Sequence, residues 1–336
     1  MDSLTHIVIG AVVGDAIVDK EFGKRAMFLG AIAQSAPDID FLASFWMDPI
    51  NDLLAHRGFT HSILFCLMAT PFLALIAERV HRPHNISFWK WCEFFGILIF
   101  LHIFLDGFNN YGTGWFEPFS HYRVSFNTVF VADPLFSIWP TISFIAILIL
   151  PRRSHRRKFW IVIGMGLTTV YLLYCTSNKF KLKYDVYKSL KEQNIPHERY
   201  FTTPAAFNNF LWYIVVDDKK GFYIGYRSVF DSKSHIDYTY FPKNDQLLDR
   251  IDENENLQKL IRFSKGYYTV EKWHDTLVFN DLRFGQVAGW HNPKNPFAFH
   301  FFINHPEAND MVVQRGRFAQ WNKETIQSLI KRIKGN

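Results

Sequence analysis

Two residues of metal-ligand type, His102 and Asp106, lie in an apolar segment of the first third of the chain. The two residues are four positions apart, so on a helix they share one face and can bind the same ion. Imidazole nitrogen and carboxylate oxygen suit zinc, with manganese or iron as alternatives. Ionisable groups at membrane depth are costly to bury and are therefore candidates for function.

Further residues of the same types lie near the ends of neighbouring apolar segments. His56 and His61 are five positions apart across a glycine-containing turn at the expected start of a helix. Asp38 and Asp40 follow Pro37, which can end a helix and free both carboxylates to point into a site. The predicted ligands of one or more divalent ions are His6, Asp38, Asp40, His56, His61, His102 and Asp106.

Some of these residues and their neighbours could also have catalytic roles. A carboxylate that is not bound to metal could act as general base, and Asp40 and Asp133 are the candidates. Arg57 is a candidate anion clamp, because guanidinium matches the geometry of phosphate and carboxylate; contact with lipid headgroups is its alternative role. A second ion is plausible, since seven ligand-type side chains exceed what one catalytic zinc takes from a protein.

Each of these residues also has a purely structural interpretation. His6 could be an interfacial or capping residue, and His102 and Asp106 could form a buried hydrogen-bonded pair. Asp40 and Asp133 could each cap the helix that follows. These interpretations would all have to hold together, so a shared location of the residues favours a metal site.

The elements that must position these residues are six apolar segments. A spanning helix needs about 20 mostly apolar residues. The first two segments are short or interrupted by polar residues, and the other four are expected to span: 4–18, 26–46, 61–77, 94–116, 134–150 and 159–178. We therefore expect an α-helical transmembrane bundle of about six spans or half-spans over residues 1–178, followed by a soluble α+β domain over residues 179–336.

Basic residues gather in alternate loops between these segments. Under the positive-inside rule those loops are cytoplasmic together, which places every candidate ligand and the C-terminal domain on the external side. The basic residues are Lys20, Lys24, Arg25, Arg79, Arg82, Lys90, Arg152, Arg153, Arg156, Arg157 and Lys158. Seven scattered residues thereby become one candidate site at the external membrane boundary.

Composition agrees with a membrane protein that carries a polar domain. Mean hydropathy is −0.05, because an apolar first half is diluted by a charged second half. The net charge of +6 is mild and its basic residues flank apolar segments, so no nucleic-acid partner is expected. The three cysteines lack CxxC spacing, which suggests neither a disulfide framework nor a thiolate zinc site. The N-terminus lacks the features of a cleaved signal peptide, and its first segment is expected to remain.

The C-terminal region has the patterns of a mixed domain. Residues 212–216 and 221–229 are rich in β-formers and flank a polar turn, which predicts a hairpin. Further strands are expected at 267–270, 276–279 and 297–302, and helices at 247–263 and 323–334.

Several short motifs in order resemble a known family. They are Asp2-Ser3-Leu4-Thr5-His6, Pro37-Asp38-Ile39-Asp40, His56-Arg57-Gly58, Thr60-His61-Ser62, His102-x-x-x-Asp106, Tyr111-Gly112-Thr113 and Asp133-Pro134-Leu135. Over about the first 175 residues the chain resembles the membrane-bound metal-dependent hydrolases, bacterial and archaeal inner-membrane proteins that include LexA-binding members. The resemblance implies a zinc-type hydrolase of the bacterial inner membrane and gives no substrate. The His/Asp pattern is also loosely similar to that of zinc-dependent phospholipases C.

The function expected is hydrolysis at the outer membrane–water boundary. A bound divalent ion can produce hydroxide at neutral pH, and the location suits a phospholipid or another lipid-linked ester. A second possibility is a structural metal that ties helix ends together while the external domain binds a partner or ligand. A transporter is less favoured, because the ionisable residues cluster toward one face and not at the bilayer midplane.

Overall fold

The structure is a computed structural model that describes residues 1–81, 86–249, 255–303, 309 and 321–335. The chain divides into two compact units. The first contains Met1–Ala43 and Ala55–Cys175, and the second contains Ser44–Leu54 and Thr176–Asn336. Arg82, expected in a cytoplasmic loop, lies outside the described residues.

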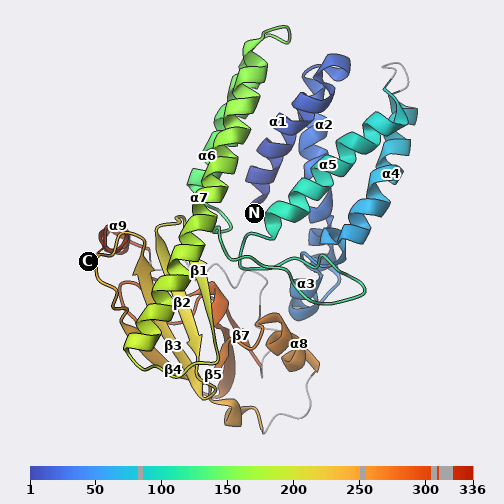
Figure 1. Cartoon of the computed structure of the whole chain (residues 1–336). Coiled ribbons are helices and arrows are strands. Elements are labelled where there is room, and N and C mark those ends of the chain that lie inside the picture. Colours follow the sequence, from blue (N-terminus) through green and yellow to red (C-terminus); the bar gives the residue numbers. More distant parts are fainter. Residues whose placement is uncertain (82–85, 250–254, 304–308, 310–320, 336) are drawn as a thin grey trace. The chain divides into compact units, whose positions relative to one another are not determined.

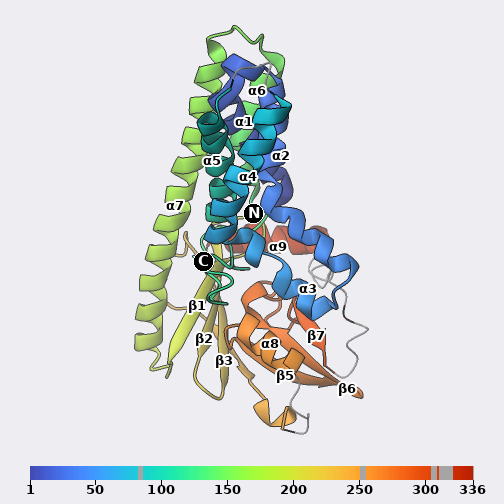
Figure 2. The same ribbon diagram turned by 90° about the vertical axis from the view of Figure 1, so that its right-hand side faces the viewer.

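The first unit is a helical bundle. Its helices run side by side in both ribbon views (Figures 1 and 2). They are α1 (Ser3–Phe22), α2 (Arg25–Gln34), α4 (Ile63–Val80), α5 (Phe88–Asp106), α6 (Pro134–Ile149) and the first part of α7 (Arg156–Glu192). Two short 3₁₀ helices, η1 (Ala36–Phe45) and η2 (Phe59–His61), lie between α2 and α4 in the chain, together with α3 (Pro49–Ala55).

Glycines let α1 and α2 pack backbone against backbone. A Cβ built on Gly14 would lie 2.7 Å from the Ala26 carbonyl oxygen and 2.7 Å from the Gly30 Cα. A Cβ on Gly10 would overlap the side chain of Gln34, the last residue of α2. Small residues at a crossing allow close approach of helices in membranes. The end of α2 is therefore held in place by the packing of α1.

Three helices of the described chain are long and apolar enough to cross a membrane: Ile63–Val80, Phe88–Asp106 and Arg156–Glu192. The apolar helices Ser3–Val18 and Pro134–Ile149 are shorter, and α2 has 10 residues. All six expected segments therefore contain helix, but three of them fall short of the usual spanning length of about 20 residues. The expectation of six spans is supported for three.

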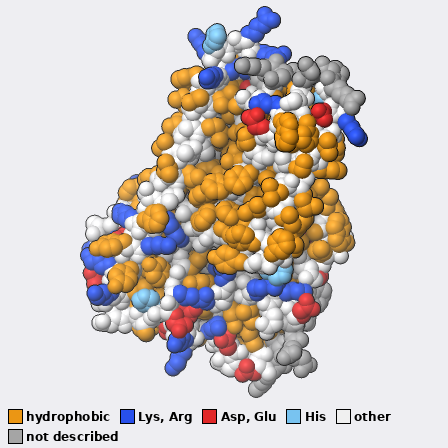
Figure 3. Space-filling model, turned by 45° about the vertical axis from the view of Figure 1, so that its right-hand side comes forward, with side chains coloured by type: hydrophobic (Ala, Val, Ile, Leu, Met, Phe, Trp, Pro, Cys, Tyr) orange, Lys and Arg blue, Asp and Glu red, His pale blue; other side chains and the backbone are white. Residues whose placement is uncertain are grey.

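The outer surface of the bundle is apolar. Leu67 and Phe72 on α4 are 66% and 63% exposed, and Ile145 on α6 and Val162 on α7 are also exposed. Figure 3 shows hydrophobic side chains covering much of the visible face of this unit. An apolar surface of this size indicates contact with membrane.

One expected boundary in the bundle is wrong. The apolar segment 94–116 was expected to be helical throughout, but α5 begins at Phe88 and ends at Asp106. The chain then turns, because the Asn109 side chain accepts a hydrogen bond from the Tyr111 backbone N–H and competes with helix formation. Asp106 thus lies at a helix end.

The second unit contains two antiparallel sheets. The first has the order β1 (Arg199–Pro204), β2 (Leu211–Asp217), β3 (Gly221–Ser228) and β4 (Tyr238–Pro242), and the second has the order β5 (Tyr268–Trp273), β6 (Thr276–Asp281) and β7 (His300–Phe302). Helices α8 (Glu255–Phe263) and α9 (Lys323–Ile333) complete the described part, with 3₁₀ turns η4 (Asp245–Leu247) and η5 (Leu282–Phe284). The predicted hairpin is confirmed as β2–β3.

Strand β2 is buried on both faces. Trp212, Ile214 and Val216 belong to a core that includes Leu182 and Val186 from the C-terminal part of α7. The alternate residues of β2 face a second core shared with the other sheet. Helix α7 therefore continues beyond the expected end of the last segment at residue 178 and covers one face of the first sheet (Figure 1).

Candidate metal centre

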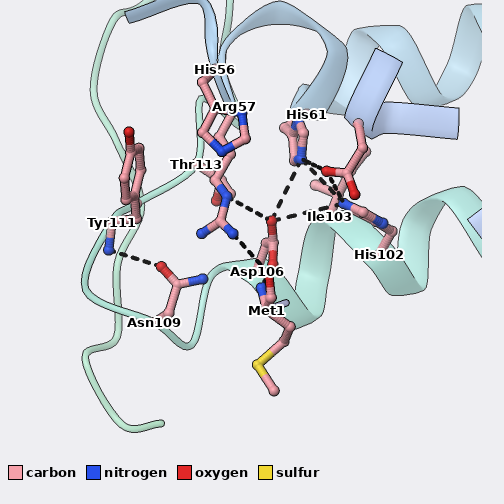
Figure 4. A network of polar contacts seen from close by, with 12 residues as sticks. Met1, His56, Arg57, His61, His102, Ile103, Asp106, Asn109, Tyr111 and Thr113 are labelled. Carbon is pink, nitrogen blue, oxygen red and sulfur yellow. Dashed lines mark hydrogen bonds and ion pairs between the residues drawn. The ribbon is translucent and has the colours of Figure 1, made fainter. Parts of the chain in front are cut away.

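Four side chains of the first unit point their ligand atoms at one another. His61 Nε2 lies 3.1 Å from His102 Nε2 and 3.6 Å from Asp38 Oδ1. His102 Nε2 lies 3.4 Å from the same Asp38 oxygen. Asp106 Oδ2 lies 3.5 Å from His61 Nε2 and 3.8 Å from His102 Nε2. Figure 4 shows His61, His102 and Asp106 converging from η2 and α5.

The partners of the two imidazoles fix which nitrogen carries the proton. His102 Nδ1 lies 2.6 Å from the Gln34 carbonyl oxygen, which can only accept, so Nδ1 donates. His61 Nδ1 lies 3.1 Å from the Thr60 hydroxyl, which itself donates to Asp40 Oδ2, and 3.3 Å from that carboxylate oxygen. The neutral rings therefore present their Nε2 lone pairs to the centre, as metal-binding histidines do when the other nitrogen is hydrogen-bonded.

This arrangement fits a tetrahedral cation. With bonds of about 2.0–2.1 Å to nitrogen and oxygen, the ligand atoms of a tetrahedral zinc ion are about 3.3–3.4 Å apart. Each histidine Nε2 lies 3.1–3.8 Å from the other three atoms. Two lone pairs and two carboxylate oxygens facing one another in a buried space repel unless a cation lies between them.

His6 adds a fifth group from α1. Its Nε2 lies 3.1 Å from Asp106 Oδ1, and its ring stacks on that of His102 with centroids 3.7 Å apart. His6, His102 and Asp106 form one group with the spacing for an ion, and Asp38, His61 and His102 form another. His102 belongs to both groups and has only Nε2 free, so it could be a ligand in one of them at a time.

Asp40 and His56 lie beside these groups and not in them. Asp40 accepts hydrogen bonds from the Arg57 backbone N–H at 2.7 Å and from Thr60, and its Oδ1 lies 3.2 Å from His56 Nδ1. Burial would raise the pKa of Asp40, but the hydrogen bonds from His56 and His61 hold it below the ordinary value. Burial lowers the pKa of His56, against the opposing effect of Asp40. Asp40 is thus a carboxylate that orients two histidines.

Arg57 lies against the same centre with positive φ (58°). Its Nη2 donates to the Met1 carbonyl at 2.9 Å, and its guanidinium lies over the Tyr111 ring. Its Nε lies 3.1 Å from Asp106 Oδ2, but within the described chain neither atom has a hydrogen-bond partner of good geometry, nor does Arg57 Nη1. The terminal amine of Met1 contacts the other oxygen of Asp106. The Arg57 guanidinium and the terminal amine therefore flank this carboxylate.

Asp133 is placed apart from this cluster by its contacts. It is the N-cap of α6 and accepts hydrogen bonds from the Leu135 and Phe136 backbone N–H groups. Its second oxygen accepts from the Tyr171 hydroxyl at 2.9 Å. These contacts match its structural interpretation, and its role as general base stays a prediction.

The sequence interpretation missed three residues of this centre. The Gln34 carbonyl fixes the His102 ring, the Thr60 hydroxyl links His61 to Asp40, and Asn109 is fully buried with an Nδ2 that lacks a partner in the described structure. Thr60 belongs to the Thr60-His61-Ser62 motif, so the sequence carried a signal for its role. A backbone carbonyl carries no sequence signal.

The centre is buried but open at one edge. His6, His61, His102 and Asp106 are at most 1% exposed. The side chains of Asp38 and His56 are 24% and 28% exposed. Solvent can therefore reach the cluster from the side formed by η1 and the turn before η2.

Helices of membrane-spanning length and a buried histidine–aspartate cluster at their ends define an integral membrane protein with a candidate metal centre. The chain belongs to the YdjM inner membrane protein family, which matches residues 1–182. This assignment places the protein in the inner membrane and leaves its chemistry open.

Two relatives match different shares of the chain. The uncharacterized protein YfhP of Bacillus subtilis is 25% identical over 98% of this chain and 99% of its own length. The inner membrane protein YbcI of Escherichia coli is 29% identical over 36% of this chain and 69% of its own length. No solved structure matches the chain. The YfhP match includes the C-terminal domain.

Proposed function

We propose that this protein is a membrane-bound metal-dependent hydrolase. The observation that carries the proposal is a set of four acceptor atoms, from Asp38, His61, His102 and Asp106, in which each histidine Nε2 lies 3.1–3.8 Å from the other three atoms. A bound cation would offset the repulsion between these acceptor atoms. Its nitrogen and oxygen donors match zinc, with manganese or iron as alternatives.

The residues of the centre would have different roles. Asp38, His61, His102 and Asp106 would hold the ion, and His6 with the second oxygen of Asp106 offers room for another. When bound, a divalent ion supplies Lewis acidity and activates water at neutral pH. Asp40 fixes the orientation of His61 through Thr60, and such outer partners contribute about 10–100-fold to metal affinity or activity.

Arg57 and Asn109 favour an anionic substrate group. Arg57 Nη1 and Asn109 Nδ2 are buried donors without partners in the described chain, and both residues contact Tyr111. Leaving such donors unpaired costs about 1–3 kcal/mol each. An oxyanion would satisfy them beside the metal, which favours a phosphoester over a carboxylester.

His56 is placed to move a proton. Its Nδ1 is held by Asp40 at 3.2 Å, its side chain reaches the open edge, and burial keeps its pKa below the ordinary value. A neutral imidazole at pH 7 can accept a proton from an attacking water. We assign this role to His56 because Asp40 is already engaged by its hydrogen bonds.

We further propose an arrangement of the protein in the membrane. All six helices of the bundle would lie in the bilayer, the shorter ones as partial spans, with the basic loops in the cytoplasm. The metal centre and the C-terminal domain would then face the outside. A site at that boundary suits a phospholipid or another lipid-linked ester.

The rival function is a closed structural metal site whose external domain binds a partner. Four protein ligands would by themselves fill a tetrahedral shell, as in a structural site. The exposed edge at Asp38 and His56 favours the enzyme, because an ion there could take a water from the solvent side as a fifth ligand. The test is metal analysis of the purified protein together with a screen of phosphoester and carboxylester lipids. We expect stoichiometric metal and hydrolysis that His102→Ala abolishes. Hydrolysis that survives metal removal or this substitution would contradict the proposal.

A further inference from the structure

A second candidate site lies at the other end of the helical bundle. Helix α1 runs from the metal centre at His6 to Phe22, and α5 returns from Phe88 to Asp106. At the far end an open cavity of about 840 Å³ is bounded by α1, the start of α5 and the start of α7. Its basic lining residues are Lys90, Arg152, Arg153, His155, Arg157 and Lys158.

The charge of this cavity is strongly positive. Among the lining residues whose side chains the structure describes, Asp15 is the only carboxylate, and it contacts the buried Arg157. Lys90 pairs with Glu93 on the next turn of α5 at 2.8 Å. Arg153 and Lys158 are exposed at the rim. Figure 3 shows Lys and Arg side chains at this end of the bundle, beyond the apolar zone.

Part of the cavity lining is apolar. Ile17 comes from α1, and Ile161 and Val162 come from the first turns of α7. Val162 is 59% exposed and begins the apolar surface of that helix. A ligand here would meet cationic and aliphatic groups together.

We propose that this cavity binds the phosphate-bearing headgroup of an anionic phospholipid, with its acyl chains against Ile161 and Val162. The volume lies within the range of about 300–1,000 Å³ for small-molecule sites. Basic pockets between membrane helices bind such headgroups by charge. The inference is independent of the metal centre. Free phosphate shares the headgroup chemistry, and the experiment separates the two sources.

The test measures the Kd of the full-length, detergent-solubilised protein for three probes: dioctanoyl-phosphatidylglycerol, dioctanoyl-phosphatidylcholine and inorganic phosphate. We expect phosphatidylglycerol to bind most tightly. The double variant Arg153→Gln/Lys158→Gln should weaken its binding about 30-fold at low salt, from the usual contribution of two cations near a membrane surface.

The matched control removes the same charge from the same end of the bundle. Arg79 and Arg156 are exposed and do not line the cavity, so Arg79→Gln/Arg156→Gln should change the Kd less than twofold. Equal losses in both double variants would show diffuse attraction and overturn the proposal. The proposal would also be overturned if phosphatidylcholine bound as tightly as phosphatidylglycerol. It would be overturned equally if inorganic phosphate bound as tightly as phosphatidylglycerol.

Discussion

Replacement of Asp38 by Asn separates a metal centre from an ordinary ion-pair network. The recorded partners of Asp38 Oδ1 are the Nε2 atoms of His61 and His102, at 3.6 Å and 3.4 Å. If those nitrogens carry lone pairs, the carboxylate repels them in the metal-free protein and attracts a cation in the metal-bound protein. An amide would donate a hydrogen bond to either ring and bind the cation poorly.

The size of both effects can be worked out. Structural zinc sites contribute about 10–16 kcal/mol over four ligands, so one ligand contributes about 3 kcal/mol, or about two orders of magnitude in Kd. At a zinc concentration of about 100 times the wild-type Kd, zinc stabilises the wild type by about 2.7 kcal/mol and Asp38→Asn by about 0.4 kcal/mol. In chelator, the new hydrogen bond should stabilise the variant by about 0.5–1.5 kcal/mol.

The assay is thermal unfolding in detergent, with excess chelator and with zinc. Asp38→Asn should raise the melting temperature in chelator and reduce the shift that zinc produces. The control is Asp133→Ala, which removes a carboxylate elsewhere in the bundle and should lose about 1 kcal/mol of helix capping equally in both conditions. A variant of Asp38 that is less stable in chelator and responds fully to zinc would refute the reasoning.

Four further outcomes follow from the same contacts. Asp40→Asn should weaken zinc binding about 10–100-fold in chelator competition, because it orients a ligand without binding the ion. Arg57→Gln should keep its zinc but lose about 100-fold in phosphoester turnover, and unchanged turnover would remove Arg57 from the mechanism. Burial lowers the pKa of His56, so turnover should be maintained at pH 7 and should fall at acidic pH as His56 becomes protonated. The variant His56→Gln should lack this decrease at acidic pH in its pH–rate profile. Gly10→Ala, which overlaps α2, should destabilise the bundle by about 1–3 kcal/mol. Gly166→Ala lies within α7 and has nothing within 4 Å, so it should not lower the melting temperature.

Spacing on one helix was enough to place part of the centre. The four-residue interval between His102 and Asp106 predicts a shared helix face, and both side chains lie fully buried on α5 with their ligand atoms 3.8 Å apart. The expectation that distant polar residues meet also agrees with the geometry, since His6, Asp38 and His61 join them. Whether the five bind metal stays a prediction.

Roles that depend on side-chain direction could not be read from the sequence. Asp38 and Asp40 are two positions apart, but one faces the centre and the other faces the far nitrogen of His61. That difference arises from the 3₁₀ backbone of η1, which residue types alone do not specify. The positive φ of Arg57, which aims its backbone N–H at Asp40, had no glycine or asparagine to indicate it.

Helix ends were the least predictable feature of the fold. The aromatic residues after Asp106 resemble a continued span, but Asn109 and Gly112 turn the chain. Helix α7 was expected to end where charged residues begin, yet its stripe of Leu182 and Val186 finds a core in the second unit. Hydropathy identifies apolar segments, whereas these ends depend on local hydrogen bonds and on packing far along the chain.

The central claim is that acceptor atoms from Asp38, His61, His102 and Asp106 surround a cation. X-ray absorption at the zinc edge of the purified protein, with total metal analysis, tests it directly. We predict at least one zinc per chain, nitrogen and oxygen ligands at about 2.0–2.1 Å, and scattering from at least two imidazoles. Absence of stoichiometric metal, a sulfur ligand shell, or a spectrum unchanged by His102→Ala would contradict the account.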